Sequence, residues 1–352
     1  MTGGAPRGLS AGEAGAPRGL PAGAPRALWT AVAGARRGLA RRGAGVTRVV
    51  TLGETMALLD PVADGELALG SLLTLRIAGA ESNFAVGLAR LGLDVAWISR
   101  LGADRPGALV RDALTAEGVD LRWVAEDPAA PTGLFYKWRT DGRTSVAYYR
   151  HGSAASRLSG ADVPDEALRG AALVHLTAIT MALGEGPRAL VLDVARRARA
   201  AGATVTFDPN YRPALWESPA AAAAAIAPVL EHVDWLLCGA GEAESVFGTA
   251  DPARLGAAGA VVRAADRGSL MAAAGEVITV EPQRAEEVVD EIGAGDAYAA
   301  GFVYGLLQGW EPPACARAGH VIAGWALRGT GDWETLPRLA DVSELLESQP
   351  RH

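Results

Sequence analysis

The chain is 352 residues long, 49% hydrophobic and 21% charged, with a formal net charge of −7 at pH 7. This length is enough for one large α/β domain or two modest domains. The acidic balance argues against a nucleic-acid partner, because phosphate binding requires clustered Lys and Arg side chains. No run of about 18 uninterrupted apolar residues occurs, which argues against a membrane partner.

Residues 1–46 differ in composition from the rest of the chain. The sequence GAPRGL occurs at 4–9 and 15–20, and the tract holds seven Arg but a single acidic residue, Glu13. With so little to bury, the tract is expected to be a disordered Gly/Ala/Pro/Arg-rich extension. Two alternatives stay open: a translation start assigned too early, and an Arg-rich targeting peptide, against which the single serine argues.

The first half of the remaining chain alternates short strands and helices. Two strands flank Gly53 and Glu54 within 48–60. Further elements are expected as strands at 72–80 and 94–102 and as helices at 81–91 and 105–118. Segment 132–150 contains two alternating stretches around an Asp-Gly turn, the pattern of a β-hairpin. Because segments 55–79 and 132–150 have no helices to cover them, we expect their strands to form a small β-sheet lid.

From residue 171 the pattern changes to repeated strand–helix units. Strands are expected at 172–179, 204–210, 233–239, 259–265 and 269–275, and helices at 187–201, 218–232 and 294–308. Such repetition favours an α/β fold with a mostly parallel central sheet covered on both faces. Binding sites in such sheets lie at the carboxyl ends of the strands. We take 47–340 as the folded domain and 341–352 as a C-terminal tail.

Cysteine, histidine and lysine usage excludes several kinds of site. Cys238 and Cys315 form no CxxC pair, so we expect free thiols in a reducing cytoplasm. The five histidines show no metal-ligand spacing. The only lysine is Lys137, so no P-loop lysine exists, and any handling of nucleotide phosphates must do without one.

The stretch DEIGAGDAYAAGF at 290–302 places two glycines and an aspartate at the start of an expected helix. One interpretation is close packing of a helix end against a strand. The other is an anion-binding turn, because glycines leave backbone N–H groups uncovered where the helix dipole is positive. Beside a bound phosphate, the carboxylate of Asp296 would accept a hydroxyl proton. The pattern then suits phosphoryl transfer to an alcohol.

This stretch resembles the DTxGAGD signature of the ribokinase-like (PfkB) carbohydrate kinases, with Glu291 in place of the threonine. The stretch AGAESNFAVGLARLGLDVAWISRLGAD at 78–104 is similar to the family's amino-terminal signature, and GTGDWETLP at 329–337 to its carboxy-terminal segment. The resemblance covers about residues 47–340. It implies a three-layer α/β fold with a β-sheet lid, ATP as phosphoryl donor, and Mg²⁺ bridging the phosphates.

Within the family, TFDPNYRPALW at 206–216 and AYYRHGSAAS at 147–156 resemble kinases of 2-dehydro-3-deoxygluconate, a keto-deoxy sugar acid. Arg150 and Arg212 would then converge on the substrate carboxylate, which guanidinium groups bind bidentately. The alternatives are a fructokinase or other hexose kinase, and a sugar-acid-binding sensor with weak or no kinase activity.

The resemblance also assigns roles to individual residues. It implies that Asp296 is the catalytic base and that Gly293, Ala294 and Gly295 form the anion hole. Substrate contacts fall on Gly79, Asn83, Phe135, Tyr148, Arg150, Arg212 and Asp332, and nucleotide contacts on Glu242, Arg263, Gly268 and His320. Mg²⁺ is expected on the phosphates, with Glu242 reaching it through water. The resemblance also implies a homo-oligomer, because lid sheets of this type often pair across a dimer.

The sequence departs from the family pattern at several positions. Ala78 replaces the first glycine of a Gly-Gly pair, and Phe135 replaces a tyrosine. The other departures lie on the nucleotide side, at Gly239, Arg263, Ala265 and His320. Since the base and the anion hole are intact, we expect a working kinase whose donor affinity is altered.

Overall fold

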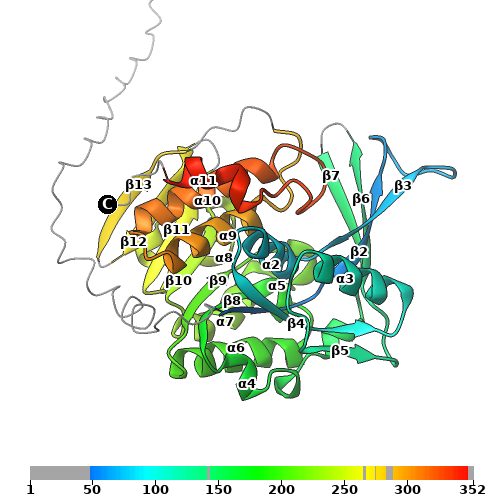
Figure 1. Cartoon of the computed structure of the whole chain (residues 1–352), viewed down its shortest axis with the longest axis horizontal. Helices are drawn as coiled ribbons and strands as arrows, with labels where there is room; N and C mark the ends of the chain where they lie inside the picture. The colour runs from blue at the N-terminus through cyan, green and yellow to red at the C-terminus, as the bar shows by residue number, and fades with distance from the viewer. Residues whose placement is uncertain (1–47, 141–142, 265–266, 274, 283–287, 348–352) are drawn as a thin grey trace, which may run out of the picture.

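The computed structural model describes residues 48–140, 143–264, 267–273, 275–282 and 288–347 (Figure 1). The extension expected at 1–46 and the departure at Ala265 lie outside the described residues. Within the described part, no helix is both long and apolar enough to cross a membrane.

The large sheet has nine strands in the described part of the chain, in the order β13-β12-β11-β10-β9-β8-β1-β4-β5. Their bounds are β1 Arg48–Leu52, β4 Asp94–Gly102, β5 Val124–Asp127, β8 Ala171–Thr177, β9 Thr204–Asp208, β10 Trp235–Gly239, β11 Gly259–Arg263, β12 Ser269–Ala273 and β13 Glu276–Val280. Only the pairs β11–β12 and β12–β13 are antiparallel. The mostly parallel sheet expected from the strand–helix repeats is therefore confirmed.

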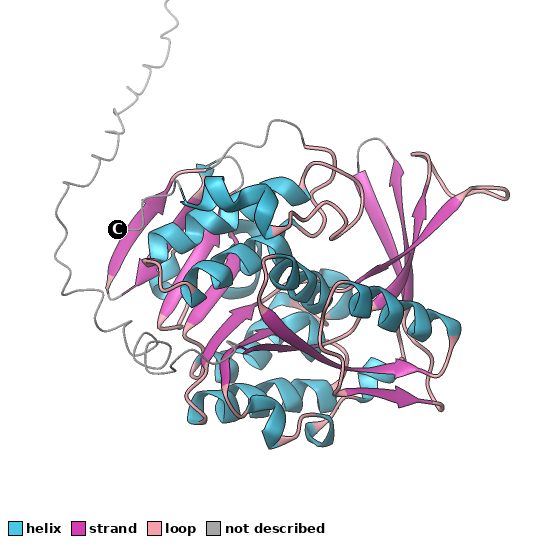
Figure 2. Cartoon of the chain, viewed as in Figure 1, coloured by secondary structure: helices cyan, strands magenta, loops and turns pink. Residues whose placement is uncertain are grey.

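Helices cover both faces of this sheet (Figure 2). One face carries α2 (Ala80–Arg90), α3 (Arg105–Ala116), α9 (Ala294–Leu307), α10 (Pro312–Ala326) and α11 (Leu339–Glu347). The other carries α4 (Asp165–Leu168), α5 (Ala178–Met181), α6 (Glu185–Ala200), α7 (Pro219–Leu230) and α8 (Ala240–Phe247). The result is the expected three-layer α/β fold.

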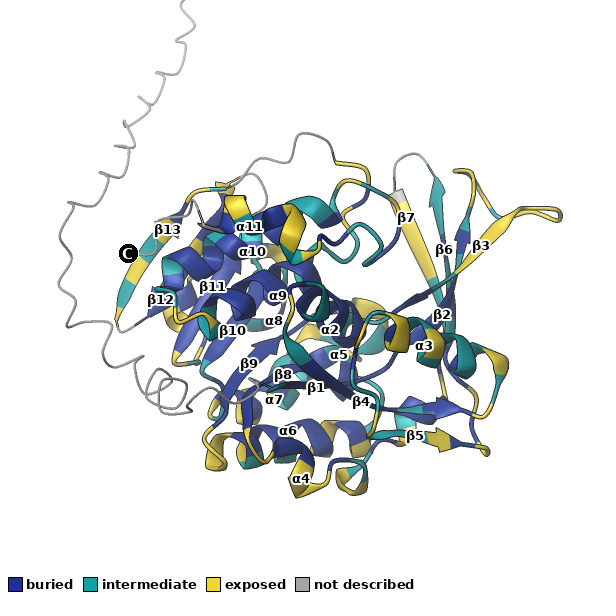
Figure 3. Cartoon of the chain, viewed as in Figure 1, coloured by how far each residue is buried: buried dark blue, intermediate teal, exposed yellow. Residues whose placement is uncertain are grey.

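The strand sequences explain why both faces are covered. In β10, Trp235 and Leu237 pack into the core on the α9 side, whereas Leu236 and Cys238 pack into the core on the α7 side. A strand buried on both faces must be apolar throughout, which is why these strands have continuous apolar runs instead of alternation. Figure 3 shows the resulting buried centre of the sheet.

A second sheet of four strands, β3-β2-β6-β7, stands beside α2 and α3 (Figure 1). Its strands are β2 Met56–Pro61, β3 Leu73–Ala78, β6 Leu134–Thr140 and β7 Arg143–Tyr149. Met56, Leu58, Ala78 and Phe135 form a small apolar cluster on its inner face. Its outer face keeps Leu73, Leu75 and Tyr149 exposed.

Some elements were not anticipated. The sequence patterns did not predict β5, β13, α4, α5, α8, α10 or α11. Helix α11 overlaps the segment 341–352 that was expected as a tail, and Val342 and Leu346 from it are buried in the core beside α10. Cys238 and Cys315 are both buried, and neither forms a disulfide in the described structure, in agreement with the expected thiols.

Candidate active site

The predicted site residues gather at the carboxyl edge of the large sheet, as expected for such sheets. Asp208, Gly239 and Arg263 are the last residues of β9, β10 and β11. The start of α9 approaches them, because Arg263 donates a hydrogen bond to the carbonyl oxygen of Gly295 (3.1 Å). The small sheet, whose central strands are β2 and β6, stands beside this edge of the large sheet (Figure 1).

Asp296, in the first turn of α9, is buried and is held by two amide side chains. Asn83 Nδ2 donates to its Oδ2 (2.8 Å), and Asn210 Nδ2 donates to its Oδ1 (3.1 Å). Burial raises the pKa of Asp296 to about 8, with further increases from nearby Asp208 and Asp332, opposed by the Asn83 hydrogen bond and by Arg212. A carboxylate with a pKa near neutrality is suited to general base catalysis.

The turn before Asp296 needs its glycine. Gly293 has φ of +79°, and a Cβ atom there would lie 2.1 Å from the main-chain oxygen of Asp332. Ala297 N donates to Gly293 O (2.9 Å), so this is the first bond of the helix, and the N–H groups of Gly295 and Asp296 have no intrahelical acceptor. Gly293, Ala294 and Gly295 are only half-buried. Close packing at Gly293 thus occurs together with main-chain N–H groups that have no intrahelical acceptor, as both interpretations of this turn require.

The amino-terminal motif brings Asn83 to the base. Gly79 caps α2, and a Cβ atom there would lie 2.2 Å from the main-chain oxygen of Glu54, so only glycine allows this close approach. One turn later, Asn83 contacts Asp296, although its expected role was a substrate contact. Ala78, which replaces the first glycine of the family pair, is buried in the small apolar cluster.

Asp208 and Asn210 are site residues that the sequence reading did not select. Asn210 has φ of +39°, a left-handed conformation that asparagine tolerates better than most residues. Its backbone N–H bonds Asp208 Oδ1 (2.8 Å), while burial raises the pKa of Asp208 to about 6. The available signal was the position of DPN at the carboxyl end of a parallel strand.

Arg263 connects the acids of the site to the anion-binding turn. Its guanidinium group lies 3.3 Å from Asp208 and 3.8 Å from Glu242, and it stacks over the Tyr298 ring at 5.3 Å. Glu242 in turn accepts the backbone N–H groups of Gly239 and Tyr211, each at 2.9 Å. The structure therefore places Arg263 and Glu242 together, next to Gly295.

Gly268 and His320 lie further along the same side. Gly268 has φ of +76°, and a Cβ atom there would lie 2.1 Å from the main-chain oxygen of Val280. His320 Nε2 lies 2.9 Å from Ser269 Oγ, and its ring meets the Tyr298 ring edge-on. Burial, with a smaller effect of Arg263, lowers the pKa of His320 to about 4, so this ring is neutral.

Arg150 follows β7 and is buried, with its Nε 2.6 Å from Oε2 of Glu54. Ser153 Oγ donates a hydrogen bond to the other oxygen of Glu54. The Arg150 guanidinium stacks over the Tyr148 ring, which itself packs against Phe135. Its Nη1 is buried and has no hydrogen-bond partner among the described residues. Phe135, Tyr148 and Arg150 thus form one group on the small sheet.

Arg212 is less constrained. Its side chain is 43% exposed, donates to the carbonyl oxygen of Tyr211 (3.2 Å) and lies 3.9 Å from Glu242. The positive charge of Arg212 lowers the pKa of Asp296, so Arg212 favours the ionised carboxylate. The structure shows no direct contact between the described side chains of Arg150 and Arg212.

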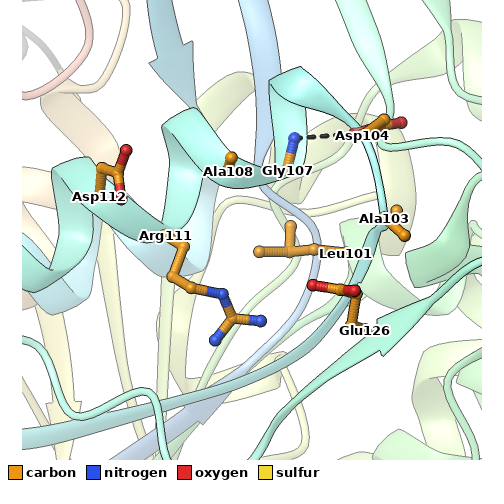
Figure 4. Close-up of a pocket in the computed structure, with 9 residues that line it drawn as sticks. Leu101, Ala103, Asp104, Gly107, Ala108, Arg111, Asp112 and Glu126 are labelled. Atoms are coloured by element: carbon orange, nitrogen blue, oxygen red, sulfur yellow. Dashed lines mark hydrogen bonds between the residues drawn. The ribbon is translucent and has the colours of Figure 1, made fainter.

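A cavity of about 310 Å³ lies elsewhere, between β4, β5 and the start of α3. Arg111 of α3 and Glu126 of β5 are among the residues that line it (Figure 4). None of the site residues predicted from the sequence lines it.

Comparison with known proteins places this geometry in a family. Residues 46–339 match the model of the pfkB family carbohydrate kinases. The chain belongs to this family. A 2-dehydro-3-deoxygluconokinase of Bacillus subtilis is 33% identical over 85% of this chain and 95% of its own length. A 2-dehydro-3-deoxygalactonokinase of Haloferax volcanii is 33% identical over 77% and 87% of the two chains.

Structural comparison agrees. A crystal structure of a pfkB protein from Polaromonas superposes with a TM-score of 0.76, at 33% identity, over 85% of this chain and 99% of the other. This pfkB kinase is therefore a phosphotransferase that acts on an alcohol group of a carbohydrate. The resemblance read from the three sequence motifs is confirmed, as is the ribokinase-like fold.

Proposed function

We propose that this pfkB kinase transfers the γ-phosphoryl group of ATP to the terminal hydroxyl of 2-dehydro-3-deoxygluconate. The observation that carries the substrate class is Arg150, a buried cation on the small sheet whose Nη1 is not paired with any described residue. A neutral sugar offers such a cation only uncharged oxygens, whereas a sugar acid offers a carboxylate. The names of the two relatives above support the same class.

The chemical step follows from Asp296. The terminal hydroxyl attacks the γ-phosphorus, its proton passes to the Asp296 carboxylate, and the bond from the γ-phosphorus to the leaving oxygen of ADP breaks. Asn83 and Asn210 orient the carboxylate, because each donates to a different oxygen. The N–H groups of Gly295 and Asp296 would stabilise the charge on the migrating group.

Mg²⁺ fits this site only when the phosphates of ATP supply some of its ligands. The described residues contain no group of three or more His, Cys, Asp or Glu side chains arranged to hold a metal ion. Mg²⁺ commonly keeps water and phosphate ligands and uses one or two carboxylates. Glu242 and Asp208 are the carboxylates available, and both already neighbour Arg263. The ion would neutralise phosphate charge.

The nucleotide side is proposed to lie along Arg263, Gly268 and His320. Arg263 would meet the phosphates, since it already reaches the carbonyl group of Gly295 in the anion-binding turn. The neutral ring of His320 and the tight turn at Gly268 line the same region through Ser269 and Tyr298. Asp332 and Arg212 remain proposed sugar contacts beside Asp296.

An assay of ADP release with purified protein tests the proposal. The substrates are 2-dehydro-3-deoxygluconate, its galactonate epimer and fructose, each with Mg-ATP, and thermal shift measures binding in parallel. We expect turnover of a sugar acid, and loss of the preference for the acid over fructose in Arg150→Met. Preferred turnover of fructose would identify a fructokinase, and binding of the acid without ADP release would identify a sensor.

We also propose a cytoplasmic homo-oligomer that pairs through the outer face of the small sheet. Leu73, Leu75 and Tyr149 are exposed on that face, and Tyr136 and Tyr149 share a hydrogen bond there. An exposed apolar sheet face of this kind favours association with a second copy. Light scattering on the wild type and on Leu75→Glu tests it; a monomeric wild type would contradict the proposal.

A further inference from the structure

The single lysine of the chain, Lys137, has no place in the reaction as described so far, yet it is buried in the small sheet. It lies on the inner face of β6 and is 3% exposed. Three carboxylates surround its Nζ: Asp290 at 3.4 Å, Asp60 at 3.7 Å and Asp332 at 3.9 Å. A compact ammonium group can be shared among several acids in this way.

The three acids come from three different parts of the fold. Asp60 lies in β2 of the small sheet. Asp290 precedes the anion-binding turn, and its Oδ1 accepts the N–H of Ile292 (3.2 Å). Asp332 follows α10, and its main-chain oxygen lies against Gly293. One ammonium group therefore joins the small sheet to both chain segments that shape the turn before Asp296.

Neighbouring cations share Asp290 and Asp60 with Lys137, but not Asp332. Arg139 reaches Asp290 (2.8 Å), and Arg76 bridges Asp60 (3.1 Å) to Glu334 (2.9 Å). Among the described residues, Lys137 is the cation within ion-pair distance of Asp332, and none of them donates a hydrogen bond to the buried Oδ1 of Asp332. Removal of the lysine would leave buried like charges facing each other, which is strongly unfavourable.

We propose that Lys137 is a positioning residue that fixes the small sheet against the phosphoryl-transfer turn. Phe135 lies two residues before it on β6, and therefore on the same face of the strand. Tyr148 pairs with Phe135 across the sheet, and Arg150 stacks on Tyr148. The ammonium contact to Asp290 and Asp332 thus sets the distance between the sugar-binding group of the small sheet and Asp296. The inference rests on the proposed function for the identity of the sugar.

Substitution of Lys137 tests the role in catalysis. Lys137→Met keeps the length of the side chain and removes its charge. We expect the KM for the sugar acid to rise at least tenfold and the KM for ATP to change less than twofold. Lys137→Met/Asp60→Asn removes one opposing acid and should recover most of that loss. Arg122→Met, which removes an exposed cation paired with Asp120, is the control and should behave as wild type.

Unchanged KM values in Lys137→Met would overturn the proposal, as would equal losses for both substrates that the second substitution does not recover. If Lys137→Met does not fold, the role of Lys137 is tested by chemical labelling of proteins that keep the lysine. The chain has one ε-amine, so acetylation by N-hydroxysuccinimide acetate, followed at the Lys137 peptide by mass spectrometry, reports how often this contact opens.

We expect Lys137 in the ligand-free protein to be acetylated at least fivefold faster in Asp60→Asn than in the wild type, and saturating sugar acid to slow acetylation in both. Equal rates in the two ligand-free proteins would contradict the inference. This ligand-free comparison does not depend on the sugar. Absence of sugar-acid turnover together with faster acetylation in Asp60→Asn would refute the proposed substrate and leave the role of Lys137 standing.

Discussion

Asn83 Nδ2 lies 2.8 Å from Oδ2 of Asp296, although 213 residues separate the two in the sequence. The amide favours the ionised carboxylate and so opposes the effect of burial, which raises the pKa of Asp296 to about 8. The start of α2 therefore controls the protonation state of the residue at the start of α9.

Asn83→Ala should move the activity profile to higher pH. Loss of the donated hydrogen bond raises the pKa of Asp296, and each added unit lowers the ionised fraction at pH 7 about tenfold. The measurement is kcat/KM for the sugar between pH 6 and 10, with Ser82→Ala on the same helix as control. A variant with the same profile as the wild type would show that Asn83 does not tune the base.

Asp296→Asn should reduce kcat by roughly three or more orders of magnitude, since the base is lost and the amide misplaces the hydroxyl. Sugar binding should change little. Single-turnover kinetics and calorimetric titration of the sugar separate the two quantities. Near-normal turnover would refute the assignment of Asp296 as the base.

The same substitution should stabilise the protein at alkaline pH. Asp296 has a pKa of about 8 when folded, against 3.8 as its ordinary value, so the native state holds the proton more tightly than the unfolded chain does. This contribution to stability is present at low pH and is lost as the pH rises from about 4 through about 8. We therefore expect the Tm of Asp296→Asn to exceed that of the wild type more at pH 8.5 than at pH 5. A Tm difference independent of pH would contradict the shifted pKa.

Gly293→Ala should impair catalysis far more than a matched change at the other end of α9. Both Gly293 and Gly309 have positive φ, which costs a residue with a side chain about 1–2 kcal/mol. A Cβ atom at Gly293 would also collide with Asp332 O, whereas a Cβ atom at Gly309 would meet no described residue beyond its chain neighbours within 4 Å. We expect kcat to fall about 10²- to 10³-fold in Gly293→Ala and to stay within a few-fold of wild type in Gly309→Ala. Comparable losses in both variants would mean that backbone strain alone explains the effect.

Arg150→Met should raise the KM for the sugar acid about 10- to 100-fold, the loss expected for a hydrogen bond to a charged group. It also leaves Glu54 buried without its cation, which costs about 3–5 kcal/mol. Glu54→Gln combined with Arg150→Met should recover stability but not sugar affinity. Urea unfolding and steady-state kinetics measure the two effects, and recovery of both would place Arg150 in a purely structural role.

The sequence by itself determined most strands of the large sheet, though not its edge strands β5 and β13, and the position of the glycine turn before Asp296. Continuous apolar runs such as that of β10 mark strands buried on both faces, and DEIGAGD marks a helix start that requires glycine, because these properties are local. The short helix α8 and the helices α10 and α11 were not read, since their burial depends on neighbours that the local pattern does not specify.

Only the tertiary structure decided which polar side chains lie in contact in and around the site. Asn210 reaches Asp296 from 86 residues away, Glu54 pairs with Arg150, and Lys137 is buried among acids from three segments. The sequence pattern does not distinguish any of these charged or amide residues from an ordinary surface residue. The order of strands in the sheets brings them together, and burial then determines their pKa values and their partners.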